Sequence, residues 1–187
     1  MDKQLNKGNV PHLKSSVLIV LLCVFAALTG MAQQQSKKQK ICFEKIIFHT
    51  TACYGSCPVY HMEVNAKKQI KLNVAEVFVK DKDLVFVPDP KKIGFFTGAV
   101  DQKRFLKLDE ALRNIGLEEI KFNGANCCDA SIITIIVYYE GKKKILKSMF
   151  PPQEAQKLIS ILYEICEKSN LIKSKDKFLI EDEGSDR

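Results

Sequence analysis

The segment TTACYGSCPVY, residues 50–60, carries the most distinctive local chemistry of this chain. Cys53 and Cys57 lie four positions apart and enclose Gly55, and Pro58 follows the second cysteine directly. The residues on both sides are rich in β-branched and aromatic side chains, which favour strands. The segment therefore predicts a tight turn between two strands, with Gly55 and Pro58 as its structural residues.

Strands are predicted on both sides of this turn and further along the chain. Residues 41–51 (ICFEKIIFHTT) form the first. In residues 59–66 (VYHMEVNA), apolar and polar side chains alternate, as in a strand with one solvent-exposed face. The alternation over residues 70–79 becomes irregular after Glu76, which favours a bulge or bend there. Further strands are expected at 84–87 (a short edge strand), 93–100, 131–140 and 144–150.

Two amphipathic helices complete the predicted fold. Asp101 is a suitable cap for a helix that extends to Ile115. A second helix opens at Pro151-Pro152 and extends to about Lys168. The order β-β-β-β-α-β-β-α predicts an α+β domain, with an antiparallel sheet of about five to six strands and both helices packed on one face.

The N-terminus has the features of a secretory signal. A basic start with Lys3, Lys7 and Lys14 precedes the uncharged apolar residues 17–28. Small residues then flank a cleavage position before Gln33. The apolar run is shorter than the ~20 residues of a spanning helix. We therefore expect a periplasmic or secreted protein with no membrane span after cleavage, although retention of the segment as an anchor stays open.

These features divide the chain into four parts. We expect a signal peptide at 1–32, a flexible leader at 33–40, a single α+β domain at 41–170 and a charged, mostly disordered tail at 171–187.

The charge balance favours a solvated surface over a nucleic-acid site. Removal of residues 1–32 would leave 26 basic and 21 acidic residues. The lysines are scattered through predicted turns, and an exported protein rarely meets nucleic acid. An envelope protein or a polysaccharide is the partner class that stays open, together with weak attraction to anionic lipid.

The cysteine count indicates disulfides in the exported chain. Six cysteines would remain after signal removal, and an even number in an exported protein favours bridges. Cys53 can pair with Cys57, or either can pair with Cys127 or Cys128. Cys42 lies among the apolar positions of a predicted strand, and Cys166 among those of a predicted helix. They are therefore either small buried hydrophobic residues or one more disulfide.

Two other uses of the cysteine turn stay open. Cys-x3-Cys-Pro resembles the copper motif of thioredoxin-like cytochrome-oxidase assembly proteins, and His49 or His61 could add nitrogen ligands to Cys53 and Cys57. That family continues into a helix, whereas residues 59–66 here alternate as a strand. Thiol–disulfide exchange is the other use, but a strand–turn–strand setting offers no helix N-terminus to lower a thiol pKa.

No hydrolase, zinc-protease or phosphate-loop motif is present in the sequence. Asp129, next to Cys127-Cys128, could belong to a cysteine-nucleophile site, but its residue type favours a turn or strand start that bonds nearby backbone N–H groups. We therefore expect no catalytic residue, no cofactor and a non-enzymatic role.

At ACYGSCPVY, residues 52–60, the sequence resembles an uncharacterised family of exported bacterial domains with a Cys-aromatic-Gly-x-Cys-Pro-x-Tyr signature. The order of elements over 43–165 fits that family, and the leader looks like those of Bacteroidota secreted proteins. Cys127-Cys128 departs from the family pattern. The resemblance implies no assigned activity.

The sequence thus predicts an exported non-enzymatic domain, supported by disulfides, that binds a partner or scaffolds the cell envelope. The alternative is a periplasmic copper-type metal protein or thiol-redox protein that uses Cys53 and Cys57.

Overall fold

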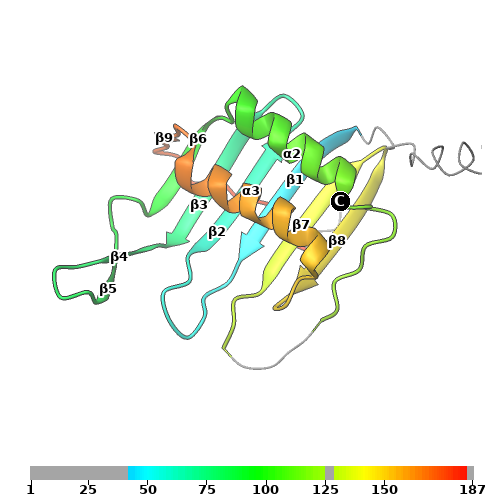
Figure 1. The fold of residues 1–187 in the computed structure, drawn as a ribbon. Coiled ribbons are helices and arrows are strands. Elements are labelled where there is room, and N and C mark those ends of the chain that lie inside the picture. The colour runs from blue at the N-terminus through cyan, green and yellow to red at the C-terminus, as the bar shows by residue number, and fades with distance from the viewer. Residues whose placement is uncertain (1–41, 125–128, 185–187) are drawn as a thin grey trace, which may run out of the picture. The chain divides into compact units, whose positions relative to one another are not determined.

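The computed structural model describes residues 42–124 and 129–184. Its main element is a seven-stranded antiparallel sheet in the order β8-β7-β1-β2-β3-β6-β9 (Figure 1). The strands are β1 (Phe43–Thr50), β2 (Val59–Asn65), β3 (Gln69–Glu76), β6 (Gly94–Ala99), β7 (Ile133–Tyr139), β8 (Lys142–Ser148) and β9 (Ile172–Lys173). A separate hairpin pairs β4 (Phe78–Lys80) with β5 (Phe86–Pro88). The α+β architecture is confirmed, but the main sheet exceeds the five to six strands predicted.

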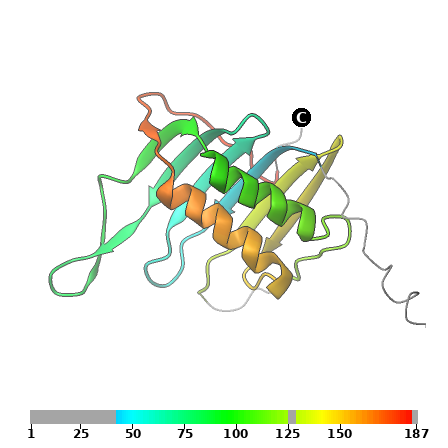
Figure 2. The same ribbon diagram turned by 45° about the horizontal axis from the view of Figure 1, so that its top comes forward.

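Two helices, α2 (Gln102–Asn114) and α3 (Gln156–Lys168), lie side by side on one face of the sheet (Figures 1 and 2). Helix α2 begins as predicted because the Asp101 side chain accepts a hydrogen bond from the Arg104 backbone N–H. Helix α3 begins later than predicted. Pro152 is extended, and a short 3-10 turn, Gln153–Ala155, separates the prolines from the helix.

The core lies between this helix pair and the sheet. Ile46 and Phe48 of β1 and Met62 of β2 are fully buried there, together with Leu108 of α2 and Leu162 of α3. Burial of an aliphatic or aromatic side chain of this size stabilises a fold by about 1.5–3 kcal/mol. The alternation read from the strands therefore sets which face receives the helices.

Strand residues between these core positions face the opposite side of the sheet. Ile47 and Ile136 are fully buried although they lie outside the helix-side core cluster. Something other than the helices must therefore cover them.

The chain after β9, residues 174–184, lies on this helix-free face, and we call it the C-terminal segment. The Ser174 backbone N–H donates to the Phe95 carbonyl oxygen at 2.8 Å. The rings of Phe178 and Phe95 meet edge to face, with centroids 5.1 Å apart. Strand pairing and side-chain contacts hold residues 172–184 in the structure, within the stretch 171–187 for which a mostly disordered tail was expected.

The signal peptide expected at 1–32 and the leader expected at 33–40 lie outside the described residues. Within the described ranges, no helix is long and apolar enough to cross a membrane.

Candidate functional site

Three chain segments leave the sheet at the same end (Figures 1 and 2). They are the turn after β1 (51–58), the hairpin after β3 (77–93) and the residues that lead into β7 (129–132). We call this the loop end of the molecule. Because the rigid sheet positions all three, it is the natural place to look for a binding site.

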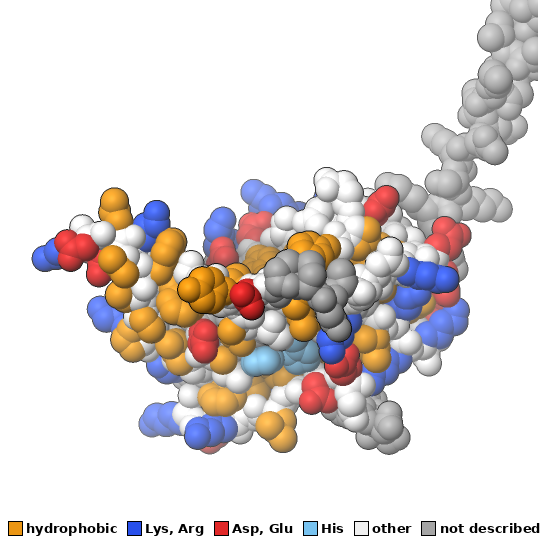
Figure 3. All heavy atoms as spheres, turned by 90° about the horizontal axis from the view of Figure 1, so that it is seen from below, with side chains coloured by type: hydrophobic (Ala, Val, Ile, Leu, Met, Phe, Trp, Pro, Cys, Tyr) orange, Lys and Arg blue, Asp and Glu red, His pale blue; other side chains and the backbone are white. Residues whose placement is uncertain are grey.

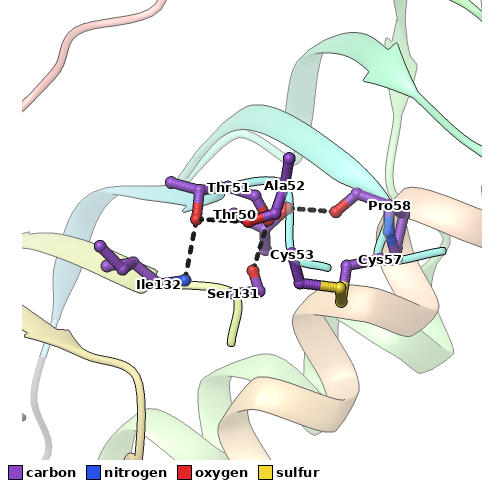
Figure 4. Close-up of a disulfide and its surroundings, with 8 residues drawn as sticks. All are labelled: Thr50, Thr51, Ala52, Cys53, Cys57, Pro58, Ser131 and Ile132. Carbon is purple, nitrogen blue, oxygen red and sulfur yellow. Dashed lines mark hydrogen bonds between the residues drawn. A yellow bond between two sulfur atoms is a disulfide. The ribbon is translucent and has the colours of Figure 1, made fainter. Parts of the chain in front are cut away.

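The first loop-end segment is the cysteine turn. Cys53 and Cys57 are joined by a disulfide (Figure 4). Gly55 between them has φ +150°, a conformation that disfavours residues with a side chain. The fully buried Thr50 hydroxyl donates to the Pro58 carbonyl oxygen at 2.8 Å and accepts from the Tyr60 N–H at 2.9 Å. Glycine, disulfide and threonine together fix the shape of the turn.

The turn is also fastened to the chain before β7. The Ser131 hydroxyl donates to the Thr51 carbonyl oxygen at 2.6 Å, and the Ile132 N–H donates to the Thr51 hydroxyl at 2.9 Å (Figure 4). Asp129 contributes its backbone carbonyl oxygen, which accepts the Tyr54 N–H at 3.0 Å. Cys127 and Cys128, the other predicted disulfide candidates, lie outside the described residues.

The second segment is the β4–β5 hairpin, which projects away from the sheet (Figures 1 and 2). We call it the arm. Its outer part exposes Leu84, Val85 and Phe86 at 73%, 56% and 51% of their surfaces. Hydrophobic side chains gather on the arm at the left of Figure 3. Contiguous apolar side chains exposed in this way mark interaction surfaces.

Local hydrogen bonds set the tip of the arm. The Asp81 carboxylate accepts from the backbone N–H groups of Asp83 and Val85, both at 2.9 Å. Leu84 between them has φ +61°, which is uncommon for a residue with a bulky side chain. The tip therefore holds its apolar side chains outward in a defined turn.

The four residues considered as metal ligands fall into two pairs. Cys53 is bonded to Cys57, and His49 Nδ1 lies 2.9 Å from His61 Nδ1. In the described part of the chain, no three His, Cys, Asp or Glu side chains group as metal ligands. Of the remaining described cysteines, Cys42 is exposed and unpaired.

Cys166 is a small buried hydrophobic residue, one of the two roles that its helical position left open. Its Sγ contacts Met62 Sδ at 3.5 Å in the core. Burial raises the pKa of its thiol, so this thiol stays protonated at neutral pH.

The histidine pair lies on the helix-free face, on neighbouring strands β1 and β2 (pale blue in Figure 3). His49 Nε2 is 2.8 Å from the Glu181 carbonyl oxygen of the C-terminal segment. Burial lowers the pKa of both rings, and the neighbouring His49 further lowers the pKa of His61. The arrangement fits two neutral rings, in which His49 donates to Glu181 and His61 donates to His49.

Glu181 also fastens the C-terminal segment through its side chain. Its carboxylate pairs with Lys45 at 2.8 Å and Lys143 at 3.1 Å, and it accepts from the Tyr138 hydroxyl. Burial acts to raise the pKa of Glu181, but the hydrogen bonds from Lys45, Tyr138 and Lys143 outweigh it and lower the pKa to about 2. This side chain therefore stays ionised at neutral pH.

A comparison with protein families matches residues 44–167 to DUF6438, a domain of unknown function. The chain belongs to the DUF6438 family. The match begins within β1 and ends within α3, so β9 and the C-terminal segment follow the matched part. Searches of curated proteins and of solved structures found no significant match to this DUF6438 chain.

Sequence reasoning located the cysteine turn of the DUF6438 domain but missed two other features. The arm was expected only as a loop with a short edge strand, because its few apolar residues lack a long alternation. Glu181 contacts Lys45 and His49, which lie 136 and 132 positions away in the sequence. The one available signal for these contacts was an acidic tail in a chain with lysines on strand faces.

Proposed function

We propose that this DUF6438 protein is an exported, non-enzymatic binding domain whose arm holds a protein partner in the cell envelope. The observation that carries the proposal is the run of exposed apolar side chains at Leu84, Val85 and Phe86. Exposure of such side chains to water is unfavourable, and burial against a partner would remove that cost.

The conformation of the arm supports this role. Leu84 adopts a left-handed backbone conformation that Asp81 stabilises from within the turn. Strained positions of this kind occur preferentially where a chain presents side chains for a function. An aromatic and aliphatic tip also suits a protein partner better than a polysaccharide, because protein interfaces favour aromatic anchors.

The remainder of the loop end supports a binding role by its rigidity. The disulfide and the hydrogen bonds of Thr50 and Thr51 tie the cysteine turn to the sheet beside the arm. A partner bound at a preorganised surface has less conformational entropy to lose. Tyr54, 90% exposed in the turn, provides a second aromatic side chain at this end of the molecule.

Site-specific photocrosslinking in cells tests the proposal. A photoreactive amino acid replaces Phe86 on the arm, and in a matched chain it replaces Leu106 on α2, which has a similar exposure of 53%. We expect one discrete adduct from position 86 in the envelope fraction and none from position 106. Absence of an adduct at 86, or the same adducts from both positions, would contradict the arm as the binding element.

The same exported protein tests its processing and the alternative at the cysteine turn. Intact mass should show a chain that begins at Gln33, with Cys53 and Cys57 resistant to a thiol reagent until a reductant is added. Stoichiometric copper, or labelling of the two cysteines without reductant, would instead make the turn the functional centre.

A further inference from the structure

A groove of about 520 Å³ lies beside the root of the arm, between β3, β6 and the C-terminal end of α3. Its floor is formed by buried Leu72 and Val74. Phe78, Phe96 and Leu171 form half-buried walls. The volume falls within the range of about 300–1,000 Å³ that is typical of small-molecule sites. The floor and the flanking walls are therefore apolar, while Tyr60 and the charged rim add polar groups to the lining.

The rim of the groove is positively charged. Lys91, Lys92 and Lys168 line it together with a single acidic residue, Glu167. Lys92 pairs with Asp89 at 3.4 Å, whereas Lys91 and Lys168 make no ion pair with any residue in the described ranges. Two lysines are therefore available to an anionic group at the mouth of the groove.

A buried polar atom adds to this arrangement. The hydroxyl oxygen of Ser169, which also lines the groove, is buried and has no hydrogen-bond partner among the described residues. A buried hydroxyl without a partner is unfavourable. After a rotation of the Ser169 side chain, its hydroxyl could donate to an acceptor that a ligand places next to Lys168.

We propose that this groove binds a long-chain carboxylate, with its alkyl chain on the apolar floor and its head group at Lys91 and Lys168. An alkyl chain suits the hydrocarbon floor because it brings no polar groups. A peptide would bring backbone N–H and C=O groups that each need a partner. The site lies apart from the exposed tip of the arm, so it goes beyond the protein-binding role proposed above.

Isothermal titration calorimetry with sodium dodecanoate, on the full chain as exported, tests this proposal. We expect saturable one-to-one binding, and weaker binding of the neutral dodecanol. Across a series from hexanoate to dodecanoate, the affinity should rise about threefold to fourfold per added methylene until the groove is filled. Lack of saturable binding, or equal affinity for dodecanol, would overturn the assignment.

Lysine variants locate the head group. The double variant Lys91→Gln/Lys168→Gln should weaken dodecanoate binding about fivefold to twentyfold, because each exposed charge contributes modestly. The matched variant Lys82→Gln/Lys103→Gln removes the same charge from exposed sites elsewhere and should change the affinity less than about twofold. Equal effects of the two pairs would show non-specific attraction and refute the site.

The two proposals fail separately. Loss of crosslinking at Phe86 leaves the calorimetry unaffected, and absence of dodecanoate binding leaves the arm's partner unaffected. Displacement of dodecanoate by an apolar peptide that binds more tightly would assign the groove to a peptide and overturn the alkyl carboxylate.

Discussion

At the residue scale, the Thr50 side chain joins the end of β1 to the start of β2. Its hydroxyl satisfies both the Pro58 carbonyl and the Tyr60 N–H just beyond His49 and His61, where the β1–β2 ladder ends. A backbone group that loses ladder pairing inside a protein needs another partner. The hydroxyl of the fully buried Thr50 side chain is that partner.

Thr50→Val tests this role. Valine has nearly the same shape but leaves both backbone groups without a partner, so the free energy of unfolding should fall by about 1–3 kcal/mol. Urea denaturation followed by circular dichroism measures it. Thr97→Val, at a half-buried position of β6, is the matched control and should change stability by less than about 0.5 kcal/mol. Equal effects of the two variants would rule out the hydrogen-bonding role.

The histidine pair predicts how stability depends on pH. The pKa of both rings is lowered in the folded protein, so the unfolded chain binds more protons below its ordinary value of about 6.5. Stability is therefore fully present above about pH 6.5 and falls as pH decreases through the lowered folded values. The hydrogen bond to the Glu181 carbonyl and the charges of Asp182 and Glu183, which act to raise the pKa of His49, reduce this effect without reversing it.

Urea denaturation at pH 7.5 and pH 5.5 measures this dependence. The wild-type protein should be less stable at pH 5.5, and the double variant His49→Gln/His61→Gln should lose most of that difference. Glu181 affects stability over a lower pH range. Its pKa of about 2 lies below the ordinary value of 4.5, so its contribution to the free energy of unfolding is lost only as pH falls below about 4.5. An unchanged slope between pH 7.5 and 5.5 in the double variant would assign the pH dependence to other groups.

At the element scale, the disulfide acts on the first hairpin. The loop between Cys53 and Cys57 is short, so the chain-entropy model gives a stabilisation of only about 2 kcal/mol. Its second effect is to hold the Gly55 turn, which sets the register between β1 and β2. The disulfide thus supports a domain that already has a substantial core.

The double variant Cys53→Ser/Cys57→Ser should therefore fold, with a free energy of unfolding lower by about 2 kcal/mol. Urea denaturation with and without reductant measures the loss, and reductant should have no further effect on the variant. Cys42→Ser, at an exposed and unpaired cysteine, provides the control and should behave as the wild-type protein does. Failure of the double variant to fold would show that the bridge is essential for this hairpin.

At the scale of the whole molecule, the C-terminal segment completes the helix-free face. Phe178 packs on Phe95, and Glu181 links β1 and the β7–β8 hairpin through Lys45, Tyr138 and Lys143. Fully buried Ile47 lies on this face between Lys45 and His49, both of which contact Glu181. The segment therefore serves as a cover in place of a second helical layer.

Truncation after Lys173 should expose the helix-free face of the sheet but leave β9 in place. We expect a loss of about 3 kcal/mol in the free energy of unfolding, since aromatic and aliphatic burial and the Glu181 pairs are lost together. Binding of a fluorescent hydrophobic dye should increase at the same time. Removal of residues 185–187 alone is the control and should change neither quantity. Wild-type stability after the longer truncation would show that the segment adds no net stabilisation.

Much of the fold was predictable because its signals are local. The alternating segment predicted at 59–66 contains β2, Val59–Asn65, and Asp101 caps a helix that ends one residue before the predicted limit. The irregular phase after Glu76 corresponds to the end of β3 before the arm. The cysteine turn was also located, because a proline, a glycine and two cysteines constrain the backbone whatever surrounds them.

The sequence by itself determined the hairpins of the main sheet, both helices and the cysteine turn, since periodicity, caps and turn residues act over a few neighbouring positions. Only the tertiary structure decided the placement of the C-terminal segment, the exposure of the arm and the groove beside it. Lys45 and Glu181 are 136 positions apart, and Leu72 and Lys168 meet at one groove only after the sheet and α3 have packed. Such contacts depend on the relative positions of distant elements, which local patterns do not specify.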